Sequence, residues 1–420
     1  MANPRSVAVF MSIGSGTTTS FLNTLPPQHV VSLTHSRVLG EKANSLNATL
    51  IDAAAFNLET KILLTPSGTS GFKLLSYQYG YAMTHGQMSA IYSGYLYDYK
   101  PTIAGNTRTL ELIALSQETT SSTNTITETY GVDSAVRVSD IVKQIASKNN
   151  WIIGTIEETI PVNRVFTQGY KSPMEFINQD LIPFAVSAVT GNGGYAVSFT
   201  TSITGKTVVN FKSITVTTPV NSYTKINGQS GRYIYNNAES TVLSWSPKVL
   251  GAVLLSGASA VSSQVMLEST GDTYKADAVS NISNSLYTGN RQWLAANQYK
   301  TLAASSASKE EADSAVRAQQ SRAMNFQYQA VATVLGDPTL TPGDTVEFNI
   351  ITDYNQLHYS SGLYVAYEVN DNIGIAGFTT DMQLMKNASW NGSNLSGATT
   401  TAQTKAKQAG WNRVGGVQYD

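Results

Sequence analysis

Few residues in this chain have the spacing that phosphate binding or nucleophilic catalysis requires. Gly205-Lys206-Thr207 looks like the end of a phosphate loop, but the glycine needed five places earlier is Thr200, and the segment lies between predicted strands. Gly191 to Gly194 is a turn, because no predicted helix begins after it to hold a pyrophosphate. Gly68-Thr69-Ser70-Gly71 and Gly228-Gln229-Ser230-Gly231 lack the spacing of a serine nucleophile elbow. The sequence therefore predicts no phosphate site and no nucleophile.

The histidines do not have the spacing of a metal site. They are His29, His35, His85 and His358, and none has a second histidine or a carboxylate at ligand spacing nearby. On one strand face, His29 and His35 would lie roughly 20 Å apart at ~3.3 Å per residue. We expect structural histidines, with no metal and no cofactor.

Glu157 and Glu158 are adjacent carboxylates in a predicted strand. Successive side chains of a strand point to opposite faces, so the two cannot act together as the acid and base of a glycosidase. This pair alone does not exclude a glycosidase or lysozyme, but no group of residues in the sequence has the pattern of such an active site. We therefore predict no catalytic residues and a protein that is not an enzyme.

The chain is unusually rich in tyrosine, with 22 residues. Two groups alternate along predicted strands and are expected to share one face each: Tyr77, Tyr79 and Tyr81 in one strand, and Tyr95, Tyr97 and Tyr99 in another. Such rows fit cross-strand stacking over a half-buried surface. They equally fit a subunit interface, where tyrosine supplies contact area with a hydrogen-bonding tip. A platform for stacking glycans is a third interpretation.

Composition narrows the class of protein. Charged residues make up 13% of the 420 residues, about half of the ~25% of ordinary globular proteins. The net charge of −1 offers no chain-wide field for nucleic acid or an anionic membrane. With no cysteine there is neither a disulfide framework nor a thiolate metal site. The start of the chain does not resemble a signal peptide, and no apolar run could span a bilayer, so we expect assembly in the cytoplasm.

Alternating patterns and turn residues predict strands on both sides of a different, central region. The expected strands of the first part are Ser6–Ile13, His29–Val38, Ser45–Asp52, Glu59–Leu64, Phe72–Tyr79, Ser89–Tyr99 and Thr107–Ser116. A Ser/Thr-rich linker follows. Later strands are expected at Phe211–Thr217, Tyr223–Ile226 and Val242–Trp245, and then from Tyr328 to Lys386. The stretch 257–304 gives no clear pattern.

Helical signals occur mainly in the central region. Ser139 is the expected N-cap of a helix that continues to about Ala146. Ser172-Pro173-Met174-Glu175 forms a capping box with proline at the first helical position, and this helix should end near Leu181. A second capping box at Ser308 predicts a helix to about Phe326.

Part of the chain is repeated. Ser93-Gly94 begins a run that continues to Leu112, and Ser361-Gly362 begins a similar run that continues to Leu384. The two runs span 18 and 22 residues, which predicts one short insertion in the second. A duplicated strand unit indicates two related β-domains on one chain.

Three passages carry a resemblance to a known family: the strand followed by Asp52 and Leu58-Glu59, the segment from Val138 to Ile177, and the segment from Gly336 to Tyr364. In this order they resemble the baseplate hub proteins of contractile-tailed phages, including the late-control D tail proteins. They are also similar to the hub part of type VI secretion spike proteins. The passages touch about half of the chain.

The resemblance implies a mainly β fold with an α+β insertion and two tandem β-barrels, each like a tail-tube subunit. The expected division is 1–118 for the first barrel, 119–134 for a linker, 135–204 for the α/β domain, 205–386 for the second barrel with an insertion at 257–326, and 387–420 for an extension.

By the same resemblance, three chains form a ring that joins a hexameric tail tube to a trimeric spike and leaves a channel for DNA in transit. The implied partners are the spike and tube proteins, with tape measure and wedge proteins as further candidates. Candidate subunit-interface residues are Tyr95, Tyr97, Tyr99, Tyr364 and Tyr367. The alternatives are a surface or secreted β-rich adhesin and another tail structural protein.

Overall fold

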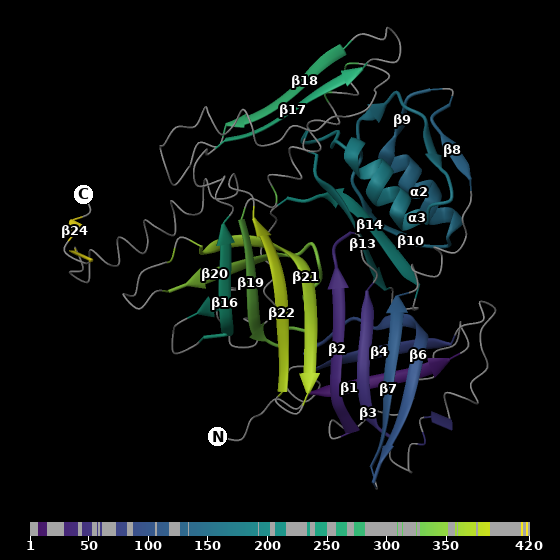
Figure 1. Ribbon diagram of the computed structural model, residues 1–420, viewed down its shortest axis with the longest axis vertical. Helices are drawn as coiled ribbons and strands as arrows, with labels where there is room; N and C mark the ends of the chain where they lie inside the picture. Colours follow the sequence, from purple (N-terminus) through teal and green to yellow (C-terminus); the bar gives the residue numbers. More distant parts are fainter. Residues whose placement is uncertain are drawn as a thin grey trace.

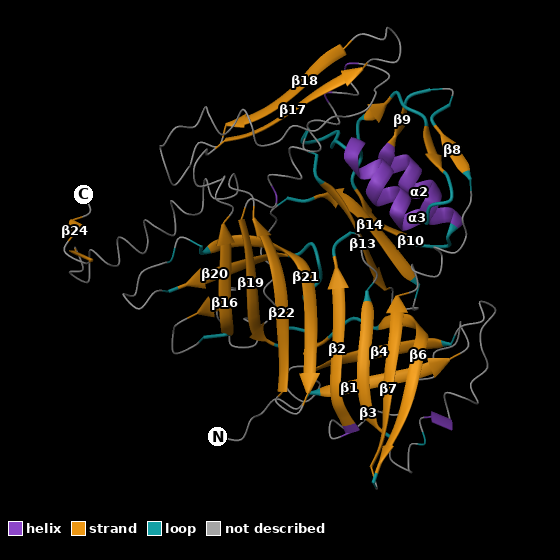
Figure 2. Cartoon of the chain, viewed as in Figure 1, coloured by secondary structure: helices purple, strands orange, loops and turns teal. Residues whose placement is uncertain are grey.

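β-Strands dominate the computed structural model of this protein, and the labelled helices α2 and α3 lie together in one region (Figures 1 and 2). The structure describes residues 7–14, 29–40, 44–52, 57, 59–60, 73–81, 87–105, 107–116, 127–132, 134–191, 193–201, 206–215, 233–235, 240–249, 258–266, 273–281, 309, 313, 325, 328–351, 358, 360–374, 377–386, 413–414 and 417–418. The predicted mainly β fold with an α/β module is confirmed. Within the described part of the chain, no helix has the length and hydropathy needed to cross a bilayer.

The first β-unit contains six main strands in the order β1-β4-β6-β7-β3-β2. Their bounds are β1 Ala8–Gly14, β2 Val30–Val38, β3 Ser45–Ile51, β4 Leu74–Tyr81, β6 Tyr92–Ala104 and β7 Thr107–Ser116, with the short β5 Gln87–Met88 beside β4. Alternation of buried and wet residues, as in β3, places leucine and alanine in the core and serine, asparagine and threonine outside. Glu59 and Thr60 are helical, so the strand predicted to begin at Glu59 is wrong there, and the rest of it lies outside the described residues.

The second β-unit repeats this strand order as β15-β20-β21-β22-β19-β16. The bounds are β15 Tyr233–Tyr235, β16 Val242–Val249, β19 Tyr328–Leu335, β20 Thr345–Ile350, β21 Gly362–Gly374 and β22 Gly377–Lys386. One difference is that β15 pairs with β20 in parallel, whereas β1 pairs with β4 antiparallel. The predicted duplication is therefore visible as two units with one strand order.

The register of the repeat differs from the prediction. β6 and β21 each have 13 residues, and β7 and β22 each have 10, so no insertion separates the copies. Both long strands also shift register after their fifth residue, at Leu96 and at Ala366. Gly94 thus corresponds to Tyr364 and not to Gly362, because pairing, and not the Ser-Gly dipeptide, defines the equivalent positions.

The α/β module lies between the two β-units in sequence and above them in Figure 1. Helix α2 (Val138–Lys148) packs against the sheet β10-β14-β13, formed by Ile152–Ile156, Thr207–Ser213 and Tyr195–Thr201. Two-residue and three-residue strands complete the module: β8 Glu128–Tyr130, β9 Val136–Arg137, β11 Pro161–Val162 and β12 Phe166–Gln168. β8 pairs with β12, and β14 pairs with β13, so both strands belong to this module.

The two helix starts had different outcomes. The capping box at Ser172 is confirmed: Ser172 accepts from the Glu175 amide, Glu175 accepts from the Ser172 amide, and α3 (Pro173–Phe176) continues through a π turn (η3, Ile177–Leu181) and a 3-10 turn (η4, Ile182–Phe184). The N-cap at Ser139 is wrong, because α2 begins at Val138 and the Ser139 hydroxyl accepts from the buried Thr159 instead.

Several expectations fall largely outside the described residues. They are the strand Tyr223–Ile226, most of the helix from Ser308, and most of the C-terminal extension. Lys309, Asp313 and Asn325 are the described residues of that helix, and all three are helical. In the stretch with no clear pattern the structure has a hairpin of β17 (Ala258–Met266) and β18 (Thr273–Asn281), and β23 (Arg413–Val414) pairs with β24 (Val417–Gln418) near the end of the chain.

Candidate functional surface

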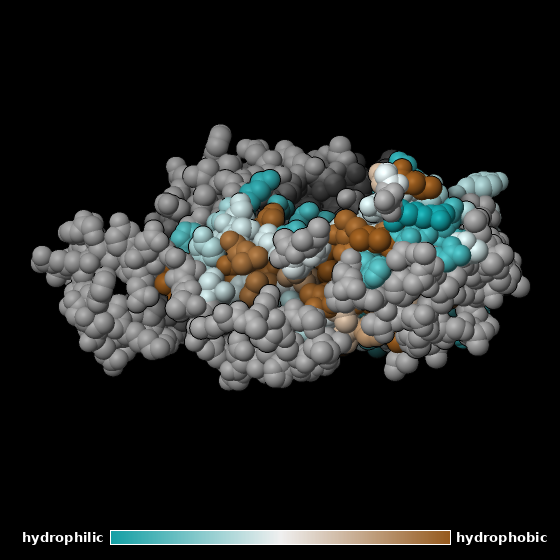
Figure 3. All heavy atoms as spheres, turned by 90° about the horizontal axis from the view of Figure 1, so that it is seen from below, coloured by the Kyte–Doolittle hydropathy of each residue, from teal (hydrophilic) through white to brown (hydrophobic). Residues whose placement is uncertain are grey.

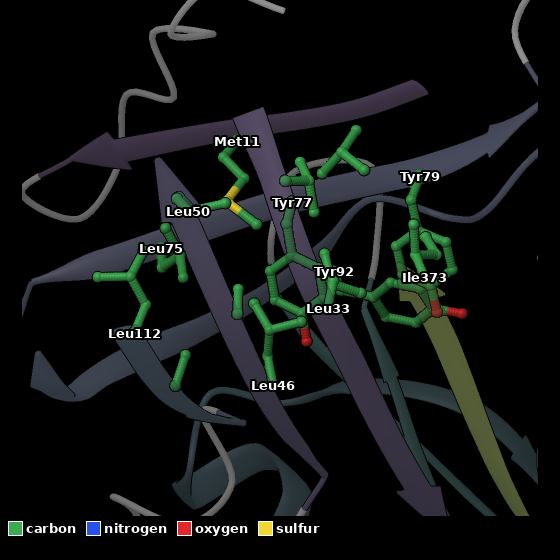
Figure 4. Packing of buried hydrophobic residues seen from close by; sticks show 14 of the residues in the cluster. Met11, Leu33, Leu46, Leu50, Leu75, Tyr77, Tyr79, Tyr92, Leu112 and Ile373 are labelled. Atoms are coloured by element: carbon green, nitrogen blue, oxygen red, sulfur yellow. The ribbon is translucent and has the colours of Figure 1, made fainter. Parts of the chain in front are cut away.

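The two β-units are joined edge to edge into one sheet. β2 of the first unit pairs antiparallel with the second half of β21, from Ser32 opposite Gly374 to Val38 opposite Glu368. The first unit's core also receives side chains from the second: Ile373 packs with Leu33, Tyr79 and the other buried residues of that cluster (Figure 4). Phe378 belongs to the same cluster. In Figure 1 the strands from β16 to β6 consequently lie side by side across both units.

A buried ion pair lies directly beneath this joint. The Arg37 guanidinium contacts the Asp371 carboxylate, and both residues are at most 2% exposed. Arg37 also donates to the Tyr92 hydroxyl at 2.8 Å and to the Leu340 carbonyl at 2.6 Å. Asp371 accepts from Tyr79 and from Thr380, each at 2.6 Å. Since Arg37, Tyr79 and Tyr92 belong to the first unit and the others to the second, the network fixes one unit against the other.

The protonation states in this network follow from its hydrogen bonds. Burial lowers the pKa of Arg37, but Tyr79, Tyr92 and Asp371 outweigh it, so the pKa lies above its ordinary value and the cation persists. Burial, with the charge of Arg37, lowers the pKa of His35 well below 6.5. His35 is therefore neutral. Because Tyr79 donates its hydroxyl proton to Asp371, His35 donates from Nδ1 to the Tyr79 oxygen at 2.8 Å and its Nε2 carries no proton.

Short polar side chains form a hydrogen-bonded row on the outer face of the joined sheet. A hydrogen-bonded row crosses four strands: Thr34 on β2 donates to Asn372 on β21, and Asn372 and Thr333 donate to Asp381 on β22 at 2.8 and 2.6 Å. These bonds hold the side chains flat against the sheet. The row crosses the joint between β2 and β21, so polar side chains of the two units contact each other on this face.

The charges on this face are few and mixed. Glu111, Glu368 and Asp381 lie on it with Lys100 and Lys248, as the alternation of buried and exposed residues shows. Phosphate-binding surfaces instead gather lysine and arginine, whose contacts dominate affinity for nucleic acid. The described residues of this face do not form such a cluster. The lower end of the molecule differs, because hydrophobic and hydrophilic areas lie side by side there (Figure 3).

The tyrosine rows had different outcomes. Tyr77, Tyr79 and Tyr81 are all buried on one face of β4, where Tyr77 and Tyr79 lie against Tyr92 and His35. The cross-strand stacking interpretation is thus confirmed for that strand.

For β6 the shared face is wrong, because the register shift after Leu96 breaks the alternation. Tyr99 turns to the core, whereas Tyr97 at the shift is 70% exposed and Tyr95 is half-buried. Tyr367 occupies the equivalent shift in β21 and is half-buried, but Tyr364 is 2% exposed and donates to the Ser360 carbonyl. Tyr364 therefore has little surface left for a subunit contact.

The remaining candidate residues have structural partners. Glu157 accepts from the amide and hydroxyl of Ser213, while Glu158 pairs with Arg137, so the two carboxylates diverge. They do not lie in a strand as predicted, because β10 ends at Ile156. Lys206 lies directly before strand β14, so no helix opens there. His358 contacts the Ser360 hydroxyl at 2.6 Å. Among the described residues, no group of histidines and carboxylates could hold a metal ion.

The Arg37–Asp371 network was not predicted from the sequence. The available signal was a charged residue at a position of each strand that the alternation assigns to the core. Lys386 gives the same signal: it is 1% exposed, donates to the Ser361 carbonyl at 2.9 Å, and burial lowers its pKa to about 7.

Comparisons with known proteins identify the fold. No family model and no curated protein matches the sequence. The structure is similar to the tail protein from Neisseria meningitidis MC58, with a TM-score of 0.53 and 11% identity over 91% of this chain and 98% of that chain. It is also similar to the 43 kDa tail protein of prophage MuSo2 from Shewanella oneidensis, with a TM-score of 0.54 and 12% identity over 91% of this chain and 99% of that chain. The chain thus has the fold of phage tail proteins over nearly their whole length.

Proposed function

We propose that the protein is a structural baseplate hub of a contractile phage tail. Three chains form a ring with pseudo-sixfold symmetry, which joins a hexameric tail tube to a trimeric central spike. The observation that carries this proposal is the pair of β-units with one strand order, joined edge to edge. Two equivalent units per chain allow three chains to match a sixfold partner on one side and a threefold partner on the other.

The polar outer face fits a channel for DNA in transit. Its threonine and asparagine side chains are bonded to one another or to Asp381, and its acidic groups repel phosphate. A passage that releases DNA needs such a surface. This role needs neither a catalytic residue nor a cofactor, and tape measure and wedge proteins are further candidate partners.

The solution mass tests the proposal. Light scattering behind a sizing column should find three times the chain mass of 45.1 kDa, about 135 kDa, alone or after addition of the spike protein. Negative-stain images of that particle should show a ring with a central hole. A strict monomer at high concentration, unchanged by the spike, would favour an adhesin or a different tail protein.

A further inference from the structure

The two β-units correspond residue by residue, which allows one joint to predict another. β6 begins at 92 and ends at 104, and β21 begins at 362 and ends at 374, so equivalent positions differ by 270. β2 and β16 each skip one residue near their start, between Val30 and Ser32 and between Val242 and Ser244. Equivalent positions of these two strands differ by 212.

Two strand edges pair with each other within the chain, and their equivalents pair with no described strand. β2 pairs with the second half of β21. The equivalent half of β6, from Asp98 to Ala104, pairs with β7 on one side, and no described strand lies along its other side. The same is true of β16 on the side away from β19. These segments are exposed, with Ile103 at 72% and Leu243 at 51%.

We infer that β16 of one chain pairs with the outer half of β6 of the next chain, in the register that β2 and β21 use within a chain. Applying the two differences places Trp245 opposite Ile103, Ser246 opposite Thr102 and Lys248 opposite Lys100. This pairing would form the contact between neighbouring chains of the ring, and the inference therefore rests on the proposed function. It also removes the open edges that would otherwise invite aggregation.

Prolines should leave fewer backbone hydrogen bonds between β16 and β6 of neighbouring chains than between β2 and β21 within a chain. The Asp52 amide donates to the Arg108 carbonyl, so alternate residues of β7, including Leu110, turn their polar groups toward β3. Pro101, opposite Leu110, therefore turns its backbone nitrogen toward the open edge. Pro247 is its partner in the inferred register, so the central pair has no N–H donor. Proline on an open edge also protects the separate chain from wrong partners.

The buried ion pair prevents the two kinds of joint from being exchanged. The position of Arg37 on β2 corresponds to Val249 on β16, and that of Asp371 on β21 corresponds to Pro101 on β6. If β16 replaced β2 beside β21, Asp371 would stay buried without its cation, which is strongly unfavourable. Each edge therefore has one partner, and the two units must alternate around the ring.

Disulfide trapping tests the register, since the natural chain has no cysteine. Ser246 and Thr102 face each other at a pair without backbone hydrogen bonds, where Cα atoms lie about 4.5 Å apart, within the range of a disulfide. Ser246→Cys and Thr102→Cys are made in separate chains, mixed and oxidised. The mixture should yield a cross-linked dimer, and each variant alone should not. The double variant should yield a covalent trimer on a non-reducing gel.

Two control pairs are matched to this test. Thr34→Cys with Asn372→Cys occupies the equivalent positions of the internal joint and should form a disulfide within one chain. Val331 lies opposite Ser246 on the next strand and is 50% exposed, so Val331→Cys mixed with Thr102→Cys should not cross-link. Lys248→Glu should increase the cross-linked fraction, because it replaces a like-charge pair with Lys100 by an opposite pair.

The outcomes separate this inference from the proposed function. No cross-link in the mixture, although the internal control forms, overturns the pairing. If light scattering then still finds a trimer, the ring uses other surfaces and the proposed function stands. If Val331→Cys and Thr102→Cys cross-link as well as Ser246→Cys and Thr102→Cys, the pairing is also overturned, because the two chains then touch without the inferred strand register.

Discussion

Replacing Arg37 by methionine should weaken the attachment of one β-unit to the other and lower the free energy of unfolding. The substitution removes contacts to Asp371, Tyr92 and the Leu340 carbonyl, all buried, and leaves the Asp371 carboxylate without its cation. Removing one partner of a buried ion pair costs about 3–5 kcal/mol of the free energy of unfolding. In Asp371→Asn the cation stays buried without a counter-charge, and we expect a loss of similar size.

A double-mutant cycle isolates the pair. The variant with both substitutions should lose less than the sum of the single losses, with a coupling energy of about 2 kcal/mol or more. The assay is urea unfolding, combined with hydrogen exchange of peptides that cover β2 and β21. Arg108→Met is the matched control, because Arg108 pairs with Glu59 and Asp52 while 43% exposed, and it should cost less than about 1 kcal/mol. A loss below about 1 kcal/mol for Arg37→Met, or additive effects, would refute the reasoning.

Three further predictions concern buried and capping groups. Because the pKa of His35 is lowered in the folded state, protons bind the unfolded chain more readily and acid favours unfolding. Between about pH 7 and pH 5 the free energy of unfolding, measured with urea, should fall by about 2 kcal/mol more for the natural protein than for His35→Gln. Equal losses in the two proteins would contradict this. Lys386→Met should raise the free energy of unfolding by about 1–4 kcal/mol near pH 7, because the unfolded lysine is charged there and the buried one is not fully charged. The gain should shrink steadily as the pH rises from about 7 to about 10.4, where the unfolded lysine also loses its charge; a gain independent of pH would contradict this. Ser172→Ala should lower the thermal midpoint of the α/β module by removing the cap, a loss of about 1 kcal/mol, whereas Ser198→Ala on β13, which is not a cap, should change it little.

Local patterns predicted much of the fold because they act over short distances. The alternation in β2, β3 and β7 and the capping box at Ser172 depend on neighbouring residues, and the structure confirms these strands and this helix start. The Ser139 cap failed because Thr159, twenty residues away, competes for its hydroxyl. The common face of Tyr95, Tyr97 and Tyr99 failed because one extra residue in β6 reverses the alternation.

The sequence by itself determined the class of this protein: two β-rich parts with a repeated strand pair, an α/β insertion, a low charge and no residues spaced for catalysis. Only the tertiary structure decided how the repeats meet. Pairing of β2 with β21, the ion pair of Arg37 with Asp371 and the open edges of β6 and β16 join residues that lie far apart in the chain. Hydrophobic alternation specifies which face of a strand is buried, but not which strand lies beside it, so the edges that could build a ring become visible only when every strand has its neighbours.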